Sequence, residues 1–155
     1  MNKLLKLTLL IVLSTKMNAQ QIITTDIDNF WIAYDSVIKV KENKTSVFKQ
    51  LYLDKGTTGL KDFVKYKDFN ETNYVTAFEK YPEFWKSIRK NTFVSSEQIQ
   101  KTEKALKEFR KLYPNQSKGN IYYTIGALRS GGIPNGADLI VGLEKVVGDK
   151  TTNTS

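Results

Sequence analysis

The sequence predicts an α+β domain in which about five mostly short helices precede a small β-hairpin or sheet. Between residues 28 and 113 the apolar residues recur at spacings of three and four, which is the period of a helix. After residue 120 the period changes to two, in runs rich in β-branched and aromatic residues that are typical of strands. The 155 residues are 40% hydrophobic and 12% aromatic, so the chain has enough apolar surface for one domain without disulfide or metal staples.

Residues 1–20 are predicted to be an export signal. Lys3 and Lys6 precede an apolar run at residues 7–13, and a small residue, Ala19, follows at the expected cleavage zone. The run is too short to span a bilayer, and an amphipathic or buried helix is the alternative. The signal predicts an exported protein, periplasmic or extracellular, with no transmembrane span after processing. Its removal takes away three lysines and no acidic residue, so the net charge falls from +8 to +5.

The first predicted helices are short. An apolar stripe covers residues 30–38, and Asp26 or Asp28 is expected to cap its start. A second stripe covers residues 47–52 and is expected to end at a left-handed C-cap on Gly56. A third helix is predicted over residues 60–67.

The next two helical segments have clearer signals. Residues 74–88 are interrupted by Pro82, which predicts two helices or one kinked helix. The segment 95–113 opens with Ser95 and Gln98 at capping-box spacing, and a proline follows it at position 114. We expect its aromatic residues, Phe109 and Tyr113, to lie in the core.

Two strands are predicted near the end of the chain, at residues 121–125 and 138–143. The glycine-rich loop between them, residues 129–136, has the composition of a phosphate-binding loop, but such loops lead into a helix and this one leads into a strand. A hairpin connection between the two strands is therefore expected. Residues 21–149 form one predicted domain, and residues 150–155 are a predicted disordered tail.

The composition excludes several classes of chemistry. The chain has no histidine and no cysteine, which excludes Cys/His zinc cages, Ser-His-Asp or Cys-His catalytic units and disulfides. No catalytic residue, metal ligand or cofactor is assigned to this chain. Basic residues at positions 101–111 alternate with Glu103 and Glu108, which is typical of a solvated helix face, so no nucleic-acid partner is predicted.

Three blocks of sequence resemble a known family. They are DKGTTGLKDF at residues 54–63, YPEFWKSIRKNT at 81–92 and IYYTIGALRSGG at 121–132. Together and in this order they resemble secreted zinc-dependent proteases of Bacteroidetes that are related to the gliding-motility lipoprotein B group. The resemblance covers nearly all of residues 30–146.

The resemblance implies a fold and a chemistry that this chain carries only in part. In the family, a helix bearing H-E-x-x-H follows farther along and binds zinc. Residues 142–144 resemble the block upstream of that helix, but no histidine follows Glu144 here. The chain thus resembles the N-terminal half of such a protein, an incomplete zincin-like domain that is inactive alone. Zinc is implied only for the full-length family, and a C-terminal catalytic half is an expected partner.

The family also implies a substrate cleft, because a strand near the metal often receives a peptide by strand addition. We expect the strands and the loop 129–136 to supply the cleft wall, binding a peptide or protein substrate; the alternative is that the strands only pack on the helices. The rival function is an extracytoplasmic or envelope binding module, and an enzyme using carboxylates ranks third. The candidate cleft residues are Tyr123, Thr124, Gly126, Arg129, Ser130, Gly131, Gly132 and Glu144.

Overall fold

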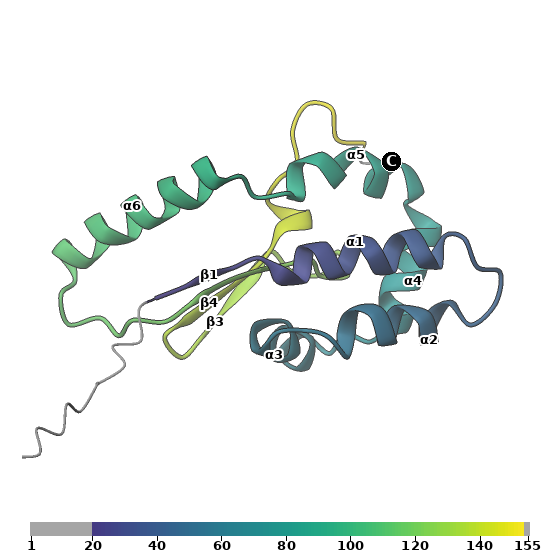
Figure 1. The fold of residues 1–155 in the computed structure, drawn as a ribbon, viewed down its shortest axis with the longest axis horizontal. Helices are drawn as coiled ribbons and strands as arrows, with labels where there is room; N and C mark the ends of the chain where they lie inside the picture. The colour runs from purple at the N-terminus through teal and green to yellow at the C-terminus, as the bar shows by residue number, and fades with distance from the viewer. Residues whose placement is uncertain (1–19, 154–155) are drawn as a thin grey trace, which may run out of the picture.

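A computed structural model describes residues 20–153, which form an α+β domain of six α-helices and a four-stranded mixed sheet (Figure 1). Residues 1–19 of the predicted export signal, which covers residues 1–20, lie outside the described residues. Five of the helices precede the long helix α6, and three of the four strands follow it. The elements are β1 (Ile22–Ile23), α1 (Thr25–Val37), α2 (Lys44–Phe48), a π-helical turn (Lys49–Leu53), α3 (Thr58–Lys67), α4 (Glu71–Lys80), α5 (Pro82–Thr92), α6 (Ser96–Leu112), β2 (Ile121–Thr124), β3 (Gly132–Asn135), β4 (Asp138–Gly142) and a 3-10 turn (Leu143–Lys145).

The strand order of the sheet is β1-β2-β4-β3. Strands β1, β2 and β4 run parallel, and β3 pairs with β4 in antiparallel fashion. The prediction of a hairpin between residues 121–125 and 138–143 is therefore wrong. The glycine-rich loop contains an extra strand, β3, whose tight turn at Gly136 (φ 60°) leads into β4, so β2 and β4 become parallel neighbours.

The helix boundaries follow from caps, with two exceptions to the predictions. The capping box of Ser95 and Gln98 is confirmed at the start of α6, and Pro82 opens α5 as a separate helix. Gly56 has no left-handed conformation; Asp68, at φ 53°, ends α3 in that region instead. Asp26 does not cap α1, because its carboxylate accepts hydrogen bonds from the N–H and hydroxyl of Thr57, at the start of α3.

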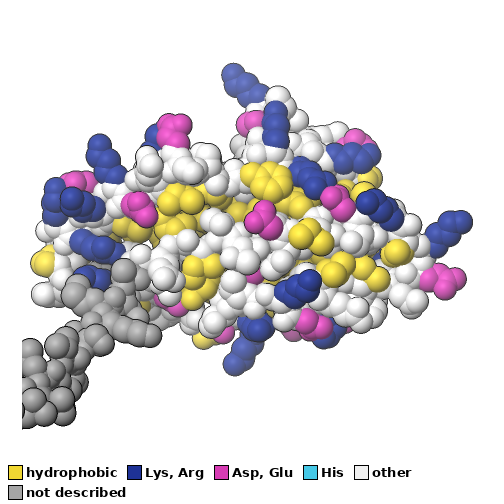
Figure 2. Space-filling model, in the orientation of Figure 1, with side chains coloured by type: hydrophobic (Ala, Val, Ile, Leu, Met, Phe, Trp, Pro, Cys, Tyr) yellow, Lys and Arg dark blue, Asp and Glu magenta, His cyan; other side chains and the backbone are white. Residues whose placement is uncertain are grey.

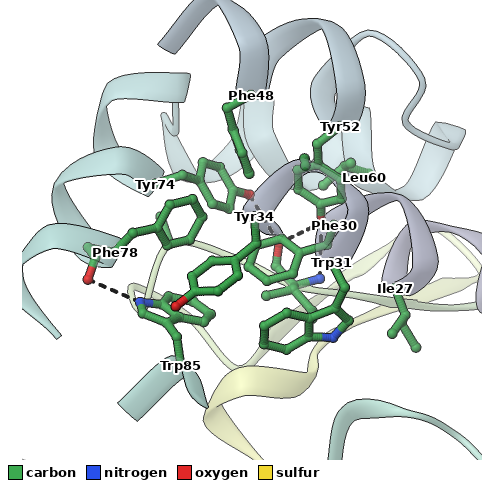
Figure 3. Packing of buried hydrophobic residues seen from close by; sticks show 14 of the residues in the cluster. Ile27, Phe30, Trp31, Tyr34, Phe48, Tyr52, Leu60, Tyr74, Phe78 and Trp85 are labelled. Carbon is green, nitrogen blue, oxygen red and sulfur yellow. Dashed lines mark hydrogen bonds between the residues drawn. The ribbon is translucent and has the colours of Figure 1, made fainter. Parts of the chain in front are cut away.

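The core is an aromatic cluster between the helices. Phe30 of α1 lies at its centre and is fully buried, in ring contact with seven other aromatic side chains (Figure 3). Helices α1, α2, α4 and α5 and the π-helical turn supply these rings. Burial of such large side chains stabilises the fold by about 1.5–3 kcal/mol each.

The two faces of the sheet pack against different helices. The pairs Tyr122–Ile140 and Thr124–Gly142 lie on one face, which packs on the helical core; a Cβ on Gly59 of α3 would overlap the Tyr122 ring. The other face carries the pairs Ile121–Leu139 and Tyr123–Val141. Helix α6 runs alongside this second face, apart from the other helices (Figure 1).

The end of the described chain is tied down. Thr151 and Thr152 hydrogen-bond with Asp149, and the N–H of Asn153 donates to the Ser87 hydroxyl on α5. These hydrogen bonds hold residues 150–153 beside α5, and the disordered tail over 150–155 stays a prediction. Among the described residues, no helix has the length and apolar character that a membrane crossing requires.

Candidate functional site: an apolar groove and a buried carboxyl

The first candidate site is a groove between α6 and the second face of the sheet, which we call the α6 groove. Leu106 and Phe109 line it from α6, and Ile121, Ala137 and Leu139 line it from the sheet and its turn, around a cavity of about 140 Å³. Farther along α6, the Thr102 hydroxyl lies 3.3 Å from the Tyr123 hydroxyl. The apolar side chains of α6 and those of the second face of the sheet therefore form the two walls of the groove, and these walls are in contact along only part of α6.

The apolar face of α6 is largely open. None of its 17 residues is buried, and Phe109 and Leu112 keep 46% and 75% of their surface exposed. Tyr113, which stacks near Phe109 with ring centroids 4.8 Å apart, is 56% exposed. The expectation that these aromatic residues lie in the core is wrong. Figure 2 shows hydrophobic side chains gathered between α6 and the helical layer.

The edges of the sheet leave little room for strand addition. Strand β4 is paired on both sides, and the N–H and C=O groups of Ile125 just after β2 bond the Tyr52 hydroxyl. The outer edge of β3 has only a few groups that could pair with an added strand. The N–H of Gly142 on β4 donates to the carbonyl of Gly131, so by antiparallel alternation the N–H and C=O groups of Gly132 point away from β4.

Both of these outward groups are occupied. The Ser130 hydroxyl accepts from the N–H of Gly132 and donates to its carbonyl, and Pro134 has no N–H to offer. Strands β2, β3 and β4 therefore present no open edge to an added strand, and the other edge strand, β1, has only two residues. The cleft wall and its strand-addition mechanism stay predictions.

The second candidate site lies at the carboxyl ends of the parallel strands β2 and β4, and we call it the Glu144 cavity. Its volume is about 430 Å³, within the range of small-molecule sites. Glu144 lies two residues after the end of β4, in the 3-10 turn, and is 3% exposed. The lining residues are Tyr81, Phe84, Leu128, Glu144, Lys145, Gly148 and Thr152.

The carboxyl group of Glu144 is held between the ends of the two strands. Its Oε2 accepts the N–H of Gly126 at 2.8 Å, so two predicted site residues meet here. Its Oε1 is a buried oxygen that has no hydrogen-bond partner among the described residues. Burial raises the pKa of Glu144 to about 7, against the lowering effect of backbone N–H groups and of Lys145.

The other predicted site residues are spread over different surroundings. The Thr124 hydroxyl is buried against the Tyr52 hydroxyl at 2.8 Å, in the core. Arg129 is exposed, donates to the carbonyl of Asp68 and lies over the Phe69 ring. Ser130, Gly131 and Gly132 form the closed edge of β3. The eight residues therefore do not converge on one cleft.

Sequence reasoning missed the residues that line both cavities from the helices. Tyr81, Phe84 and Leu106 belong to helical segments whose apolar spacing does not distinguish a cavity wall from the core. Glu144 was singled out only through the family resemblance of residues 142–144, and its burial depends on contacts with distant residues. Within residues 20–153, the acidic side chains form no group of three that could hold a metal ion.

No protein family model, curated protein or solved structure matches this chain. The α+β architecture is what the structure itself establishes. The resemblance to secreted zinc-dependent proteases stays a prediction from the residues that carry it.

Proposed function

We propose that this protein is an exported, catalytically incomplete peptidase-like protein that binds a polypeptide and does not cleave it alone. The observation that supports this most is the open apolar face of α6 beside the second face of the sheet. The α6 groove then acts as the substrate-cleft half of the protein, and a C-terminal catalytic half is the partner that hydrolysis needs.

The surface has the chemistry of a polypeptide site. Contiguous exposed apolar side chains on a soluble domain mark interaction surfaces more often than chance. Here Phe109, which lines the groove, and Leu112 and Tyr113 near it form exposed apolar surface at the C-terminal end of α6. Arg110 lines the groove and forms no ion pair within the described chain, so it offers a positive charge to an acidic group of the bound segment.

The lack of cleavage follows from the side chains. The chain has neither histidine nor cysteine, and Glu144, whose pKa burial raises to about 7, lies in the other cavity. Zinc hydrolysis therefore needs ligands from outside this chain.

Binding to a permanently unfolded acidic protein tests the proposal. The probe is fluorescent reduced and carboxymethylated α-lactalbumin, followed by anisotropy with the mature protein. We expect saturable binding that weakens about tenfold or more in the double variant Phe109→Ser and Leu112→Ser, since the loss of two apolar contacts exceeds about 1.4 kcal/mol.

The matched control is the double variant Ile32→Ser and Tyr66→Ser. These residues are 55% and 62% exposed, on α1 and α3 away from the groove, and we expect their loss to leave binding unchanged. Equal weakening by both double variants, or no binding by the wild type, would contradict the proposed site. Cleavage of the probe by the purified chain would contradict its catalytic incompleteness.

A further inference from the structure

The Glu144 cavity contains an unfilled hydrogen-bonding position. Oε2 of Glu144 is bonded by the N–H of Gly126, while Oε1 is buried and unpartnered among the described residues. An unsatisfied buried polar atom costs about 1–3 kcal/mol, and more when it is charged. Such atoms are rare in folded proteins, so each one needs an explanation.

The backbone N–H groups of Gly126, Leu128 and Glu144 lie near this carboxyl and favour its ionised form, but no hydrogen bond from a described residue reaches Oε1. A Cβ built on Gly126 would lie 2.7 Å from Oε1 and within 3.4 Å of ring carbons of Phe63 and Phe69, so these two rings pack beside the carboxyl. Ring carbons give neither a hydrogen bond nor a neutralising charge. Glu144 itself forms part of the cavity wall, so the cavity is the place from which a ligand can reach this carboxyl.

The charges around the carboxyl also leave it without a counter-ion. Tyr52 and Tyr74 lie close enough to Glu144 to interact with its charge. Burial raises the pKa values of both hydroxyls well above the usual range, so both stay neutral and neither acts as a counter-ion. Lys145 is the only cation in the lining, is exposed and acts on Glu144 more weakly than burial and the backbone N–H groups do. Its Cβ lies 3.6 Å from where a Cβ on Gly131 would be, at the β3 side.

The rest of the lining suits an organic cation. Tyr81 and Phe84 supply aromatic rings, which attract cations over their faces, and Thr152 supplies a hydroxyl. The Tyr81 ring already carries Lys80 Nζ at 5.2 Å from its centroid, so Phe84 and the second face of Tyr81 are the surfaces left for a ligand. An alkyl chain fits against Leu128, and a volume of about 430 Å³ is far larger than a single metal ion needs. Aromatic rings around one buried carboxylate are the chemistry that recognises an alkylammonium group.

We propose that the Glu144 cavity binds a primary alkylammonium group, with the Glu144 carboxylate as its ion-pair partner. In this arrangement the Glu144 carboxylate turns toward the cavity whose wall it forms. This site is separate from the α6 groove and does not rest on the proposed polypeptide binding. The ammonium group belongs either to a free small amine or to a lysine side chain.

Calorimetric titration tests the site with n-butylammonium, as a free amine, and with Nα-acetyl-lysine amide, as a lysine side chain. We expect saturable binding of at least one probe to the wild type and a loss of about tenfold or more in Glu144→Gln, which keeps the shape but removes the charge. Glu103→Gln is the matched control: it removes an exposed carboxylate on α6, outside the cavity lining, and leaves binding unchanged.

The pH dependence gives a second readout that does not depend on any variant. Only the ionised carboxylate pairs with ammonium, so the affinity of the wild type rises by about tenfold per pH unit from pH 5 to pH 7 and then levels off. Heats measured at pH 6 in two buffers should show release of a proton on binding.

Several outcomes would overturn the inference. These are equal affinity in Glu144→Gln, a pH-independent affinity, or no saturable binding of either amine. Tighter binding of butyrate than of butylammonium, lost in Lys145→Gln, would show that the cavity is an anion site instead.

Discussion

The helical layer and the α6 region use the same kind of amphipathic sequence with opposite results. In the helical layer, the stripe of α1 is closed on all sides, and Phe30 at its centre is fully buried among seven aromatic rings. In α6 an equally regular stripe leaves no residue buried. A periodic stripe therefore predicts the side of a helix that seeks apolar contact, and does not predict that the domain itself supplies that contact.

The difference separates residues that hold the fold from residues that are free to bind. The buried rings of the helical layer cannot change without a loss of folding free energy. The side chains along α6 stabilise the isolated domain little, since their surface stays in water. Substitutions in the two regions should thus have opposite effects on stability and on binding, and the predictions below test that contrast.

The largest effect is expected for Phe30→Ala. Removal of a buried ring from the centre of the cluster should lower the free energy of unfolding by about 3–5 kcal/mol, measured by urea denaturation. Leu112→Ala is the control in α6, and its effect should stay within about 0.5 kcal/mol because this side chain is 75% exposed. Similar losses for the two variants would show that α6 is part of the stabilising core.

The next largest effect is the change in the free energy of unfolding with pH that the buried carboxyl of Glu144 causes. Below pH 4.5 the carboxyl is protonated in both the folded and the unfolded state. Between pH 4.5 and its folded-state pKa of about 7, only the unfolded state releases the proton, so the folded state loses about 3 kcal/mol in relative stability as the pH rises.

Glu144→Gln should abolish this loss. The difference in unfolding free energy between the variant and the wild type, measured at pH 4 and at pH 8, should shift by about 3 kcal/mol in favour of the variant at pH 8. An unchanged difference across this range would show that the carboxyl is not desolvated in the folded protein.

A smaller effect is expected for Asp26→Ala, which removes the link between α1 and the start of α3. The Asp26 carboxylate accepts two hydrogen bonds from Thr57, and burial raises its pKa. Loss of the acceptor leaves the N–H of Thr57 unsatisfied, so thermal denaturation should report a loss of about 1–3 kcal/mol. Asp28→Ala, at an exposed position on the same turn, should change stability by less than about 0.5 kcal/mol.

The smallest effect on stability belongs to the variant that should affect binding most. Phe109→Ser with Leu112→Ser should leave the unfolding free energy within about 1 kcal/mol of the wild type. The same variant should sediment with less self-association, because exposed apolar surface is what drives association of the chain. A wild-type protein that sediments as a monomer at high concentration would contradict the prediction that the exposed apolar side chains of α6 drive self-association.

The sequence was enough to predict most of the helices, because their signals are local. The spacing of Ser95 and Gln98 and the ring of Pro82 act within one turn of chain, and both predictions are confirmed. The two strands β2 and β4 were also predicted to within about two residues, from their β-branched and aromatic runs.

Strand partners were harder to predict, because pairing depends on distant residues. Strand β1 has only two residues, and β3 consists of Gly132, Ile133, Pro134 and Asn135, a composition typical of turns. Only the register with β4 makes β3 a strand, and only its insertion makes β2 and β4 parallel. For the same reason, the sequence pointed to Glu144 and Gly126 but not to the hydrogen bond that joins them.

Hydrogen–deuterium exchange of the mature protein, free and saturated with unfolded α-lactalbumin, tests the central claim most directly. In the free protein, amides of α6 (Ser96–Leu112) should exchange faster than those of α1 (Thr25–Val37), since α6 lacks a buried face. On binding, protection should rise in α6 and in residues 137–139 of the groove. Protection of α6 equal to that of α1 in the free protein, or gained protection confined to α1 and α3, would contradict the claim that α6 is an open binding face.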